Sequence, residues 1–430
     1  MRILIINTNG GSIYHGPNLR TYYAAKELVE RGHRVILATS AFSHKYAVLP
    51  QLRGVVTPET IDGIEYRWIR TLRYRNVVER VLHNLVFGIR LLAHRTEICD
   101  SADVVVFSGP PLELFPFSWF LASRLGVPIA SDIRDLWPLT QLNMSRWHWL
   151  SPYTYLQYAC LRLMGKKSAV CISPLAGAGR YLDKICGPVR TTVIPNGFDT
   201  SMTPTQEPPR LTIVKSAEGM PPAGQQVSLD QVRTSGKFVV GYSGSFDRDN
   251  DTESLVHAAQ QLVGQHDILF LMVGAGLRRN RIVQMAASLP NLMVCDRVPS
   301  CAVPRVLEAM DACYCGLRQN PVNLYGVGLA KSYEYMAAGK PILWMIEACN
   351  NPVEESGGGF TVPPEDPAAL AAAIVRLFKM TAADRTCLGA RARSHLERHY
   401  SISVLGEQWE RCLAEVARSG GQRDPTTVGA

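Results

Sequence analysis

The sequence has no run of about 18 apolar residues, the length that a membrane-spanning helix needs. Residues 112–125 come closest, but Glu113, Pro116 and Arg124 interrupt them. The apolar segment Ile3–Ile6 is too short for a signal peptide and is not followed by a small-residue cleavage site. These absences predict a chain without a spanning helix or a secretory leader.

Two common binding signatures are also missing. The 11 cysteines have no metal-ligand spacing. The closest pair, Cys313 and Cys315, falls in an expected buried strand, so we interpret the cysteines as reduced thiols of a cytoplasmic protein. The glycine-rich loop Asn9–Gly16 does not follow the G-x-G-x-x-G pattern, so a dinucleotide fingerprint is absent.

The composition predicts a folded chain with an anionic partner. Hydrophobic residues make up 47% of the 430 residues, which is typical of globular domains, and the length suggests two or three of them. Lysine and arginine exceed the acidic residues by 45 to 37, a formal net charge of +8. This balance fits a nucleotide, a nucleic acid or an anionic lipid and does not choose among them.

Strand-like apolar runs alternate with helical patterns in both halves of the chain. Such alternation predicts an α/β fold of two Rossmann-like domains, each a doubly wound parallel sheet. We expect a first domain at 1–198, a Pro- and Gly-rich linker or insert at 199–236, and a second domain at 237–399. A helix at about 400–418 should pack back on the first domain, and 419–430 should form a disordered tail.

The segment from Gly326 to Pro341 contains a glycine-rich loop that leads into a helix. Free amides at a helix start form an anion site, and here they would come from Gly328, Leu329 and Ala330. Lys331 adds a charge in the first turn, and Glu334 lies one turn deeper, where a carboxylate suits two ribose hydroxyls. The alternative is an ordinary glycine-rich loop with a capping charge and a surface glutamate.

A second loop follows the expected strand Phe238–Tyr242. Gly244 and Ser245 would allow a ligand to approach the backbone, and Arg248 could bind a diphosphate. Residues 247–251 also contain a D-x-D pattern, which could hold a divalent cation. We favour the alternative, a solvated helix start with acidic residues, and expect no metal.

Two polar segments of the first half are further candidates. In the loop that contains Gly11, His15 and Gly16, the glycines and Pro17 match a phosphate-facing turn, and we expect His15 to be solvated. The alternative for His15 is that it faces the cleft of a two-domain fold, as Arg20 could also do. The segment Asp132–Pro138 follows a strand at the edge where α/β active sites lie; the alternative is an internal ion pair.

Residues 67–95 contain seven arginines and one acidic residue, so they carry +6 of the net charge. Valine, leucine and isoleucine recur there with helical spacing, from Val77 to Ile89. A basic amphipathic helix of this kind can lie on an anionic membrane surface, or its apolar stripe can pack into the core. Only Trp68 and Tyr74 are aromatic near the start of the cluster, which disfavours nucleic acid as the partner.

Four motifs in the same chain resemble retaining glycosyltransferases of family 4. They are Ile194–Asp199, the Gly244-Ser245-Phe246 turn, Val273–Gly276 and Tyr333–Pro341. The resemblance implies the GT-B fold and a UDP-sugar donor, bound without a metal or other cofactor. The segment Asp132–Pro138 is similar to a subgroup that builds bacterial O-antigen, capsule or exopolysaccharide, which implies an amino or deoxy sugar and a lipid-linked acceptor at the inner face of the cytoplasmic membrane.

The resemblance also implies roles for single residues. Glu334 would hold the ribose and Arg297-Val298 the base, while the diphosphate would meet Gly244, Ser245, Arg248, Lys331 and the amides of residues 328–330, with Gly11 and Gly16 also on the donor side. Arg20, Asp132 and Arg134 would lie on the acceptor side. The expected catalytic residues are Asp135, Lys331 and Arg248.

The chain departs from the family pattern at two positions. Gly326 replaces the first glutamate of the E-x7-E motif, which puts recognition of the donor sugar in doubt. Arg134 stands where many relatives have histidine, which favours Asp135 as the acceptor-side acid. Two other functions remain open: a UDP-sugar 2-epimerase of the same architecture, or a protein without catalysis that binds anionic lipid or nucleic acid.

Overall fold

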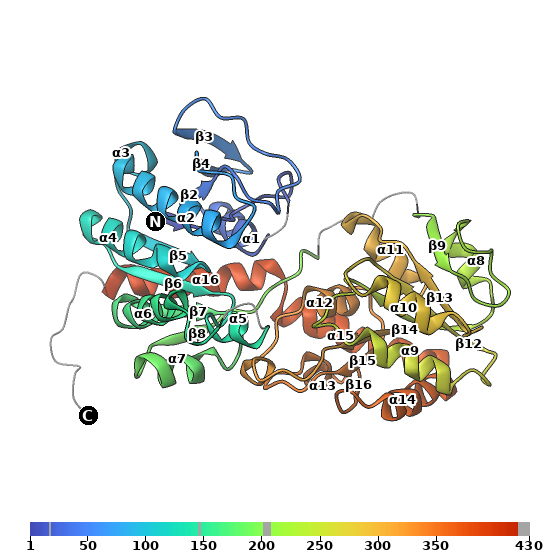
Figure 1. Cartoon of the computed structure of the whole chain (residues 1–430). Helices are drawn as coiled ribbons and strands as arrows, with labels where there is room; N and C mark the ends of the chain where they lie inside the picture. The colour runs from blue at the N-terminus through green and yellow to red at the C-terminus, as the bar shows by residue number, and fades with distance from the viewer. Residues whose placement is uncertain (17–18, 145–147, 201–207, 420–430) are drawn as a thin grey trace. The chain divides into compact units, whose positions relative to one another are not determined.

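The structure is a computed structural model that describes residues 1–16, 19–144, 148–200 and 208–419. The described chain divides into two compact units (Figure 1). The first unit contains Met1–Asn196, Tyr325–Gly328 and the chain from Ile402 onward; the second contains Gly197–Leu324 and Leu329–Ser401. Pro17 and residues 420–430, on which two expectations depend, lie outside the described residues.

The first unit is built on an eight-stranded sheet in the order β3-β4-β2-β1-β5-β6-β7-β8. All neighbouring strands are parallel except β3 and β4. The continuous apolar runs of β1 and β5 are buried on both faces, as expected for central parallel strands. The strands are β1 (Arg2–Ile6), β2 (Arg34–Ser40), β3 (Val56–Ile61), β4 (Ile64–Ile69), β5 (Val104–Gly109), β6 (Ile129–Ile133), β7 (Val170–Ser173) and β8 (Thr191–Val193).

The helices of the first unit form two packed groups. The last described helix of the chain packs on α1 and against β5 and β6, while α4 packs on α2, α6 and β5. The helices are α1 (Leu19–Glu30), α2 (Val77–Ala93), α3 (Arg95–Ile98), η1 (Leu112–Leu114), α4 (Phe115–Leu125), α5 (Leu139–Asn143), α6 (Pro152–Lys167), α7 (Ala178–Cys186) and α16 (Ile402–Ser419).

The second unit is also built on an eight-stranded sheet, in the order β10-β9-β13-β12-β11-β14-β15-β16. Its six strands from β11 to β16 are parallel, and β9 and β10 are antiparallel additions at one edge. The strands are β9 (Leu211–Lys215), β10 (Gln226–Val227), β11 (Phe238–Ser243), β12 (Ile268–Val273), β13 (Leu292–Cys295), β14 (Ala312–Gly316), β15 (Ile342–Met345) and β16 (Gly359–Thr361).

The expected linker or insert over 199–236 belongs in part to the edge of the second sheet. Residues Leu211–Lys215 pair with β13 as part of the sheet, and Leu211 and Ile213 are buried. A five-residue strand between segments rich in Pro and Gly gives little periodic signal, so the sequence pattern alone did not reveal it.

Two groups of helices cover the second sheet. Helices α9, α10 and α14 pack together, and the fully buried side chains of Phe270 and Met272 belong to the same core as α9 and α14. Helix α12 packs on α15 and β14. The helices are α8 (Leu229–Arg233), α9 (Thr252–Gln261), α10 (Arg279–Ala286), η2 (Ser300–Ala302), α11 (Val303–Glu308), η3 (Asn323–Tyr325), α12 (Ala330–Ala337), α13 (Pro352–Ser356), α14 (Pro367–Lys379) and α15 (Ala382–His399).

Candidate functional site

In each sheet, the strands that follow one another in sequence run first towards one edge and then, from the starting strand, towards the other edge. In the first sheet β1 lies between β2 and β5, and in the second β11 lies between β12 and β14. Open α/β sheets bind ligands outside the carboxyl ends of their strands at such a point. The loops after β1 and β11 are therefore the places to look for functional side chains.

Lys331 lies at the switch point of the second sheet. Its Nζ donates a hydrogen bond to the Tyr242 hydroxyl at 3.0 Å and another to Oδ1 of Asn250. The ammonium also lies 4.7 Å from the centre of the Tyr242 ring. Both partners are neutral, so neither compensates the charge, and burial lowers the pKa of Lys331.

The network around Lys331 continues into the loop after β11. The Tyr242 hydroxyl donates to the carbonyl of Ser245 at 2.6 Å, and Asn250 Nδ2 lies 3.0 Å from the Ser245 hydroxyl. A Cβ atom on Gly244 would lie 3.0 Å from the Tyr242 hydroxyl and 3.6 Å from Cε of Lys331. The structure therefore brings the predicted residues Gly244, Ser245 and Lys331 together.

Helix α12 begins at Ala330 without a capping side chain among the described residues. Its N-cap is Leu329, which has no side-chain acceptor for the first amides. By contrast, Asp251 caps α9, with its Oδ1 3.3 Å from the amide of Ser254. An uncapped helix start beside a lysine is suited to binding an anion.

Glu334 lies one turn further along α12 and is half-buried. Burial raises the pKa of Glu334, and the charge of Lys331 opposes that shift. The two residues are thus close enough to interact electrostatically, with the carboxylate deeper along the helix than the ammonium.

The remaining donor-side candidates have more exposed positions. Arg248 lies in the loop after β11 and is exposed, as is Arg297, which with Val298 follows β13, two strands from β11. Asp247 accepts a hydrogen bond from the amide of Leu277 at 3.3 Å. In the described part of the chain, no three His, Cys, Asp or Glu side chains gather to hold a metal ion; independence from metal stays a prediction.

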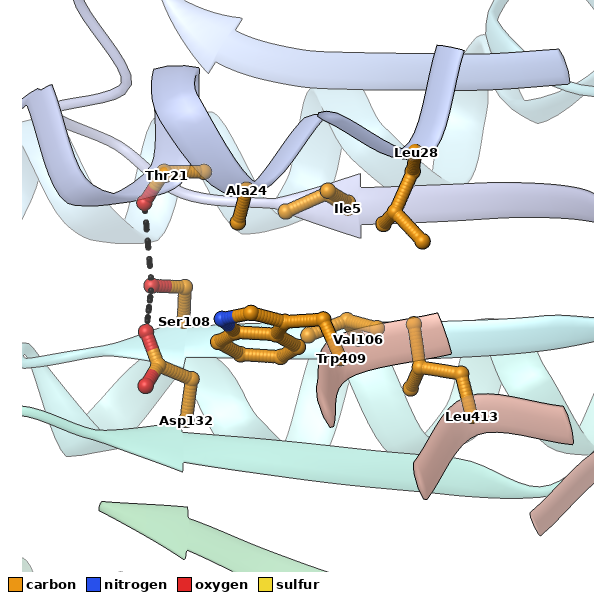
Figure 2. Close-up of a pocket in the computed structure, with 9 residues that line it drawn as sticks. All are labelled: Ile5, Thr21, Ala24, Leu28, Val106, Ser108, Asp132, Trp409 and Leu413. Carbon is orange, nitrogen blue, oxygen red and sulfur yellow. Dashed lines mark hydrogen bonds between the residues drawn. The ribbon is translucent and has the colours of Figure 1, made fainter. Parts of the chain in front are cut away.

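In the first unit, Arg20 and Asp132 pair with each other. The guanidinium donates to Oδ1 of Asp132 from Nε at 3.1 Å and from Nη2 at 3.0 Å, and the two side chains are only 9% and 2% exposed. The Ser108 hydroxyl donates to the other carboxylate oxygen at 2.9 Å. Beside this pair is a cavity of about 10 Å³, towards whose polar side the indole nitrogen of Trp409 is turned (Figure 2).

The next residues of the Asp132–Pro138 segment have different surroundings. Arg134 is half-buried and donates from Nε to the carbonyl of Gly109 at 3.1 Å, and burial lowers the pKa of Arg134. Asp135 is exposed. The ion pair of Asp132 is with Arg20 from α1, a residue outside this segment and 112 positions away, which no local motif reveals.

The loop after β1 is folded against neighbouring loops. Gly11 is buried, and its carbonyl accepts a hydrogen bond from the Tyr66 hydroxyl at 3.1 Å. Gly16 has a φ of 122°, and a Cβ there would lie 3.1 Å from the backbone of residues 45 and 47. Both glycines thus have packing roles, and their contact with a donor stays a prediction.

The expectation that His15 is solvated is wrong. The side chain is 7% exposed, bonded to the Ser12 hydroxyl at 2.8 Å and 4.7 Å from the Trp68 ring. Burial lowers the pKa of His15. The aromatic side chains that enclose it come from β4 and the loop after β2, so the glycine-rich segment gave no sign of them.

The apolar stripe of α2 faces away from the core. Phe87 and Leu91 are buried, whereas the predicted stripe includes exposed side chains: Val78 is 71%, Leu82 49%, Leu85 38% and Ile89 58% exposed. The interpretation of the stripe as a core face is therefore wrong. In the described ranges, no helix is both long and apolar enough to cross a membrane.

Three residues of these networks were not predicted as site residues. Tyr242 was considered part of an expected strand, Asn250 part of an acidic helix start, and Asn196 only part of the motif Ile194–Asp199. Asn196 donates from Nδ2 to the carbonyl of Gly328 at 3.0 Å. The Asn-Gly turn that follows Pro195 was visible in the sequence, but its partner lies 132 residues away.

Two family models match the chain. Residues 15–197 match the glycosyl transferase 4-like domain, and residues 237–380 match the glycosyl transferases of group 1. A probable glycosyltransferase, WbjE from Pseudomonas aeruginosa, is 29% identical over 184 residues. That alignment covers 41% of this chain and 44% of WbjE, so it spans less than half of either protein.

Solved structures share the fold over nearly the whole chain. Sucrose-phosphate synthase from Thermosynechococcus elongatus has a TM-score of 0.69 at 16% identity and covers 97% of this chain and 99% of its own. A UDP-forming trehalose-phosphate synthase from Burkholderia vietnamiensis has a TM-score of 0.68 at 14% identity, and the match covers 98% of each chain. HepE from Anabaena, in complex with UDP and glucose, has a TM-score of 0.63 at 13% identity, and the match covers 96% of this chain and 100% of HepE. The predicted GT-B fold is confirmed.

Proposed function

Because its two matched domains place the chain among the family 4-type glycosyltransferases, we propose that it transfers a sugar from a UDP-activated donor to a saccharide acceptor. The observation that carries this proposal is the Lys331 ammonium, whose two hydrogen bonds are to neutral side chains, beside the uncapped start of α12 at the switch point of the second sheet. Structural neighbours in complex with UDP, such as HepE, support the choice of nucleotide.

The proposed donor lies with its diphosphate at Lys331 and its ribose at Glu334. An ammonium has three N–H donors, and the hydrogen bonds to Tyr242 and Asn250 use two of them. The third can meet a phosphate oxygen, while the amides at the start of α12 meet others. The Glu334 carboxylate can accept hydrogen bonds from the two ribose hydroxyls.

The chemistry that these groups supply is electrostatic. When the bond between the sugar and the diphosphate breaks, negative charge grows on the departing diphosphate. Fixed donors aimed at that charge lower the barrier, and their effect is often the largest single contribution to catalysis. Arg248 would add a second positive charge from the loop after β11, and Asp135 would act on the acceptor side.

The finer parts of the proposal follow the family resemblance. We propose retention at the anomeric carbon, an amino or deoxy sugar, and a lipid-linked acceptor of surface-polysaccharide synthesis. Gly326 has a φ of 109°, a conformation that a glutamate rarely adopts, so a glutamate at this position would be strained. Recognition of the donor sugar must therefore use other groups than a side chain at this position.

We also propose that α2 docks the first unit on an anionic membrane face. Leu82, Leu85 and Ile89 offer apolar surface, and Arg73 and Arg75 are exposed at the approach to the helix. The carboxylate of Glu79 accepts a hydrogen bond from the amide of Arg75 at 2.6 Å but keeps its charge, so the arginines must outweigh one negative charge at the start of the helix. Such a helix binds by apolar burial together with attraction to lipid headgroups.

Calorimetric titration with UDP tests the donor site. Glu334→Gln should weaken UDP binding by about 1.5–3 kcal/mol, because a charged acceptor of ribose hydroxyls becomes neutral. Glu397→Gln, on the exposed side of α15, is the matched control and should bind UDP like the wild type. Equal UDP affinity in both variants would contradict the role of Glu334.

Incubation with a UDP-sugar alone separates a transferase from an epimerase. A transferase leaves the sugar intact or hydrolyses it slowly, whereas a 2-epimerase converts it to the other epimer. Conversion without an acceptor would overturn the proposed function.

A further inference from the structure

A chain of hydrogen bonds in the first unit leads from Asp132 to the loop before α12. Arg20, which is held by Asp132, also donates from Nη1 to the carbonyl of Pro195 at 2.8 Å and to Oδ1 of Asn196 at 3.2 Å. Asn196 in turn donates from Nδ2 to the carbonyl of Gly328 at 3.0 Å. Residues Tyr325–Gly328 belong to the first unit, although Leu324 and Leu329 on either side belong to the second.

Arg20 determines which way the amide group of Asn196 points. A guanidinium has only donors, so the Asn196 atom that faces it must be the carbonyl oxygen. The NH2 group is thereby directed at the carbonyl of Gly328. Asp132 completes the arrangement, since its carboxylate holds two guanidinium nitrogens and accepts a further bond from Ser108.

The bond to the Gly328 carbonyl fixes one peptide plane. A trans peptide is planar, and its N–H points opposite to its C=O. With the Gly328 oxygen held by Asn196, the N–H of Leu329 is turned away from Asn196. Leu329 is the N-cap of α12, so this amide is one of those that precede Lys331 at the proposed diphosphate site.

We infer that Arg20, Asp132 and Asn196 are positioning residues that aim the Leu329 amide at the diphosphate of the donor. This inference rests on the proposed function, because it names what the held loop is for. A buried ion pair is poor evidence of stabilisation, since well-packed apolar side chains of similar volume often serve as well or better. Here the ion pair of Arg20 and Asp132 orients the side-chain amide of Asn196, whose other hydrogen bond holds the carbonyl of Gly328 just before α12.

The space around Gly328 supports a direct dependence on Asn196. A Cβ atom on Gly328 would lie 3.0 Å from Nδ2 of Asn196, closer than most such contacts. Gly328→Ala should therefore disturb the same hydrogen bond from the other side, without removing any polar group.

The test compares the affinities for UDP and for uridine, which has no phosphate. Asn196→Asp keeps the shape and still accepts from Arg20, but it places a second oxygen against the Gly328 carbonyl. We expect UDP binding to weaken about tenfold, as for the loss of one hydrogen bond to a charged group, while uridine binding stays unchanged. Arg20→Lys and Gly328→Ala should give losses of the same kind, so the test does not depend on a single variant folding.

Ser131→Ala is the matched control. Ser131 precedes Asp132 on β6 and loses its 2.7 Å hydrogen bond to the Ser168 hydroxyl, yet it has no part in the chain to Gly328. This variant should bind UDP and uridine like the wild type, even if its melting temperature falls.

Three outcomes would count against the inference. The inference is wrong if the folded variants bind UDP like the wild type. It is also wrong if they lose affinity for UDP and for uridine equally, because the loop then does not act on the phosphates. Neither outcome affects the proposed function. Wild-type protein that binds no UDP would overturn the proposed function, and the inference with it.

Discussion

Lys331 carries a charge in surroundings that disfavour it. Burial lowers the pKa of Lys331, and its two partners, Tyr242 and Asn250, are neutral. A bound diphosphate would add negative charge to that of Glu334 and Asp247 and stabilise the protonated form. We therefore expect the protonation of Lys331 to be linked to the binding of an anionic ligand.

We predict that UDP affinity falls as the pH rises through the lowered pKa of Lys331. Below that pKa the ammonium is already charged, so binding takes up no proton. Above it, binding must add a proton to Lys331, and the free energy of binding becomes less favourable with each pH unit. Calorimetry in buffers of different ionisation enthalpy should detect this proton uptake.

Lys331→Met removes the titrating group and is the control for this experiment. Its UDP affinity should be weaker than that of the wild type and independent of pH over the same alkaline range. If the UDP affinity of the wild type is likewise independent of pH, Lys331 does not contact the diphosphate.

At the scale of single elements, the sequence predicts central parts better than edges. The buried runs of β1, β5, β11 and β12 fit the predicted alternation of apolar strands and helices, because continuous apolar segments between turn residues are typical of parallel strands. The edge hairpin of β3 and β4 was missed, although Asp62 and Gly63 both have positive φ, as such a turn requires. The alternation of apolar and polar residues in β4 was a usable strand signal, whereas Pro58 and the polar residues of β3 give a weak one.

The candidate site shows the same limit. Lys331 and Glu334 were predicted from a local motif, because a glycine-rich loop before a helix is recognisable within a few residues. Tyr242, Asn250 and Asn196 were not, since their partners lie 89, 81 and 132 residues away. Hydrogen bonds between distant segments depend on the fold, and one sequence contains no direct sign of them.

The exposed stripe of α2 gives the prediction at this scale. Leu82, Leu85 and Ile89, changed together to serine, should abolish cosedimentation with anionic liposomes at low salt, because each apolar side chain loses about 1.5–3 kcal/mol of burial. Arg73, Arg75 and Arg80, changed to glutamate, should have the same effect, since each arginine near the surface contributes about 1 kcal/mol that salt screens.

Leu277→Ser is the control for the liposome experiment, because Leu277 is 86% exposed but belongs to the second unit. It should leave binding intact. If wild-type protein partitions equally to neutral and anionic vesicles, or to neither, the stripe of α2 does not dock on an anionic membrane.

At the scale of the whole molecule, the chain leaves the first unit and returns to it. Helix α16 packs on α1, and Trp409 is 6% exposed in the same core as Ile5 and Leu28. Two polar contacts accompany it: His33 lies 2.9 Å from Glu410, and Arg31 donates to the carbonyl of Ser403 at 2.7 Å. The first unit is thus completed by residues far from the rest of it in sequence.

We predict that Trp409→Ala destabilises the first unit by about 3–5 kcal/mol, the usual effect of deleting a buried aromatic side chain. Denaturant unfolding, followed by a probe in the first unit, measures the change. Trp149→Ala is the matched control, because Trp149 is 63% exposed and its loss should alter stability by less than about 0.5 kcal/mol. Equal effects of the two changes would mean that α16 contributes little to the core.

Because α16 belongs to the first unit but lies at the end of the described chain, it determines when each unit can be completed during translation. The strands of the first unit emerge first, but the face of the sheet that α16 covers stays open until residues 402–419 have been made. All described parts of the second unit precede α16, so that unit can close while the first still waits. Until residues 402–419 have been made, apolar side chains such as Ile5 and Leu28 therefore lack the contacts that Trp409 and Leu413 later supply.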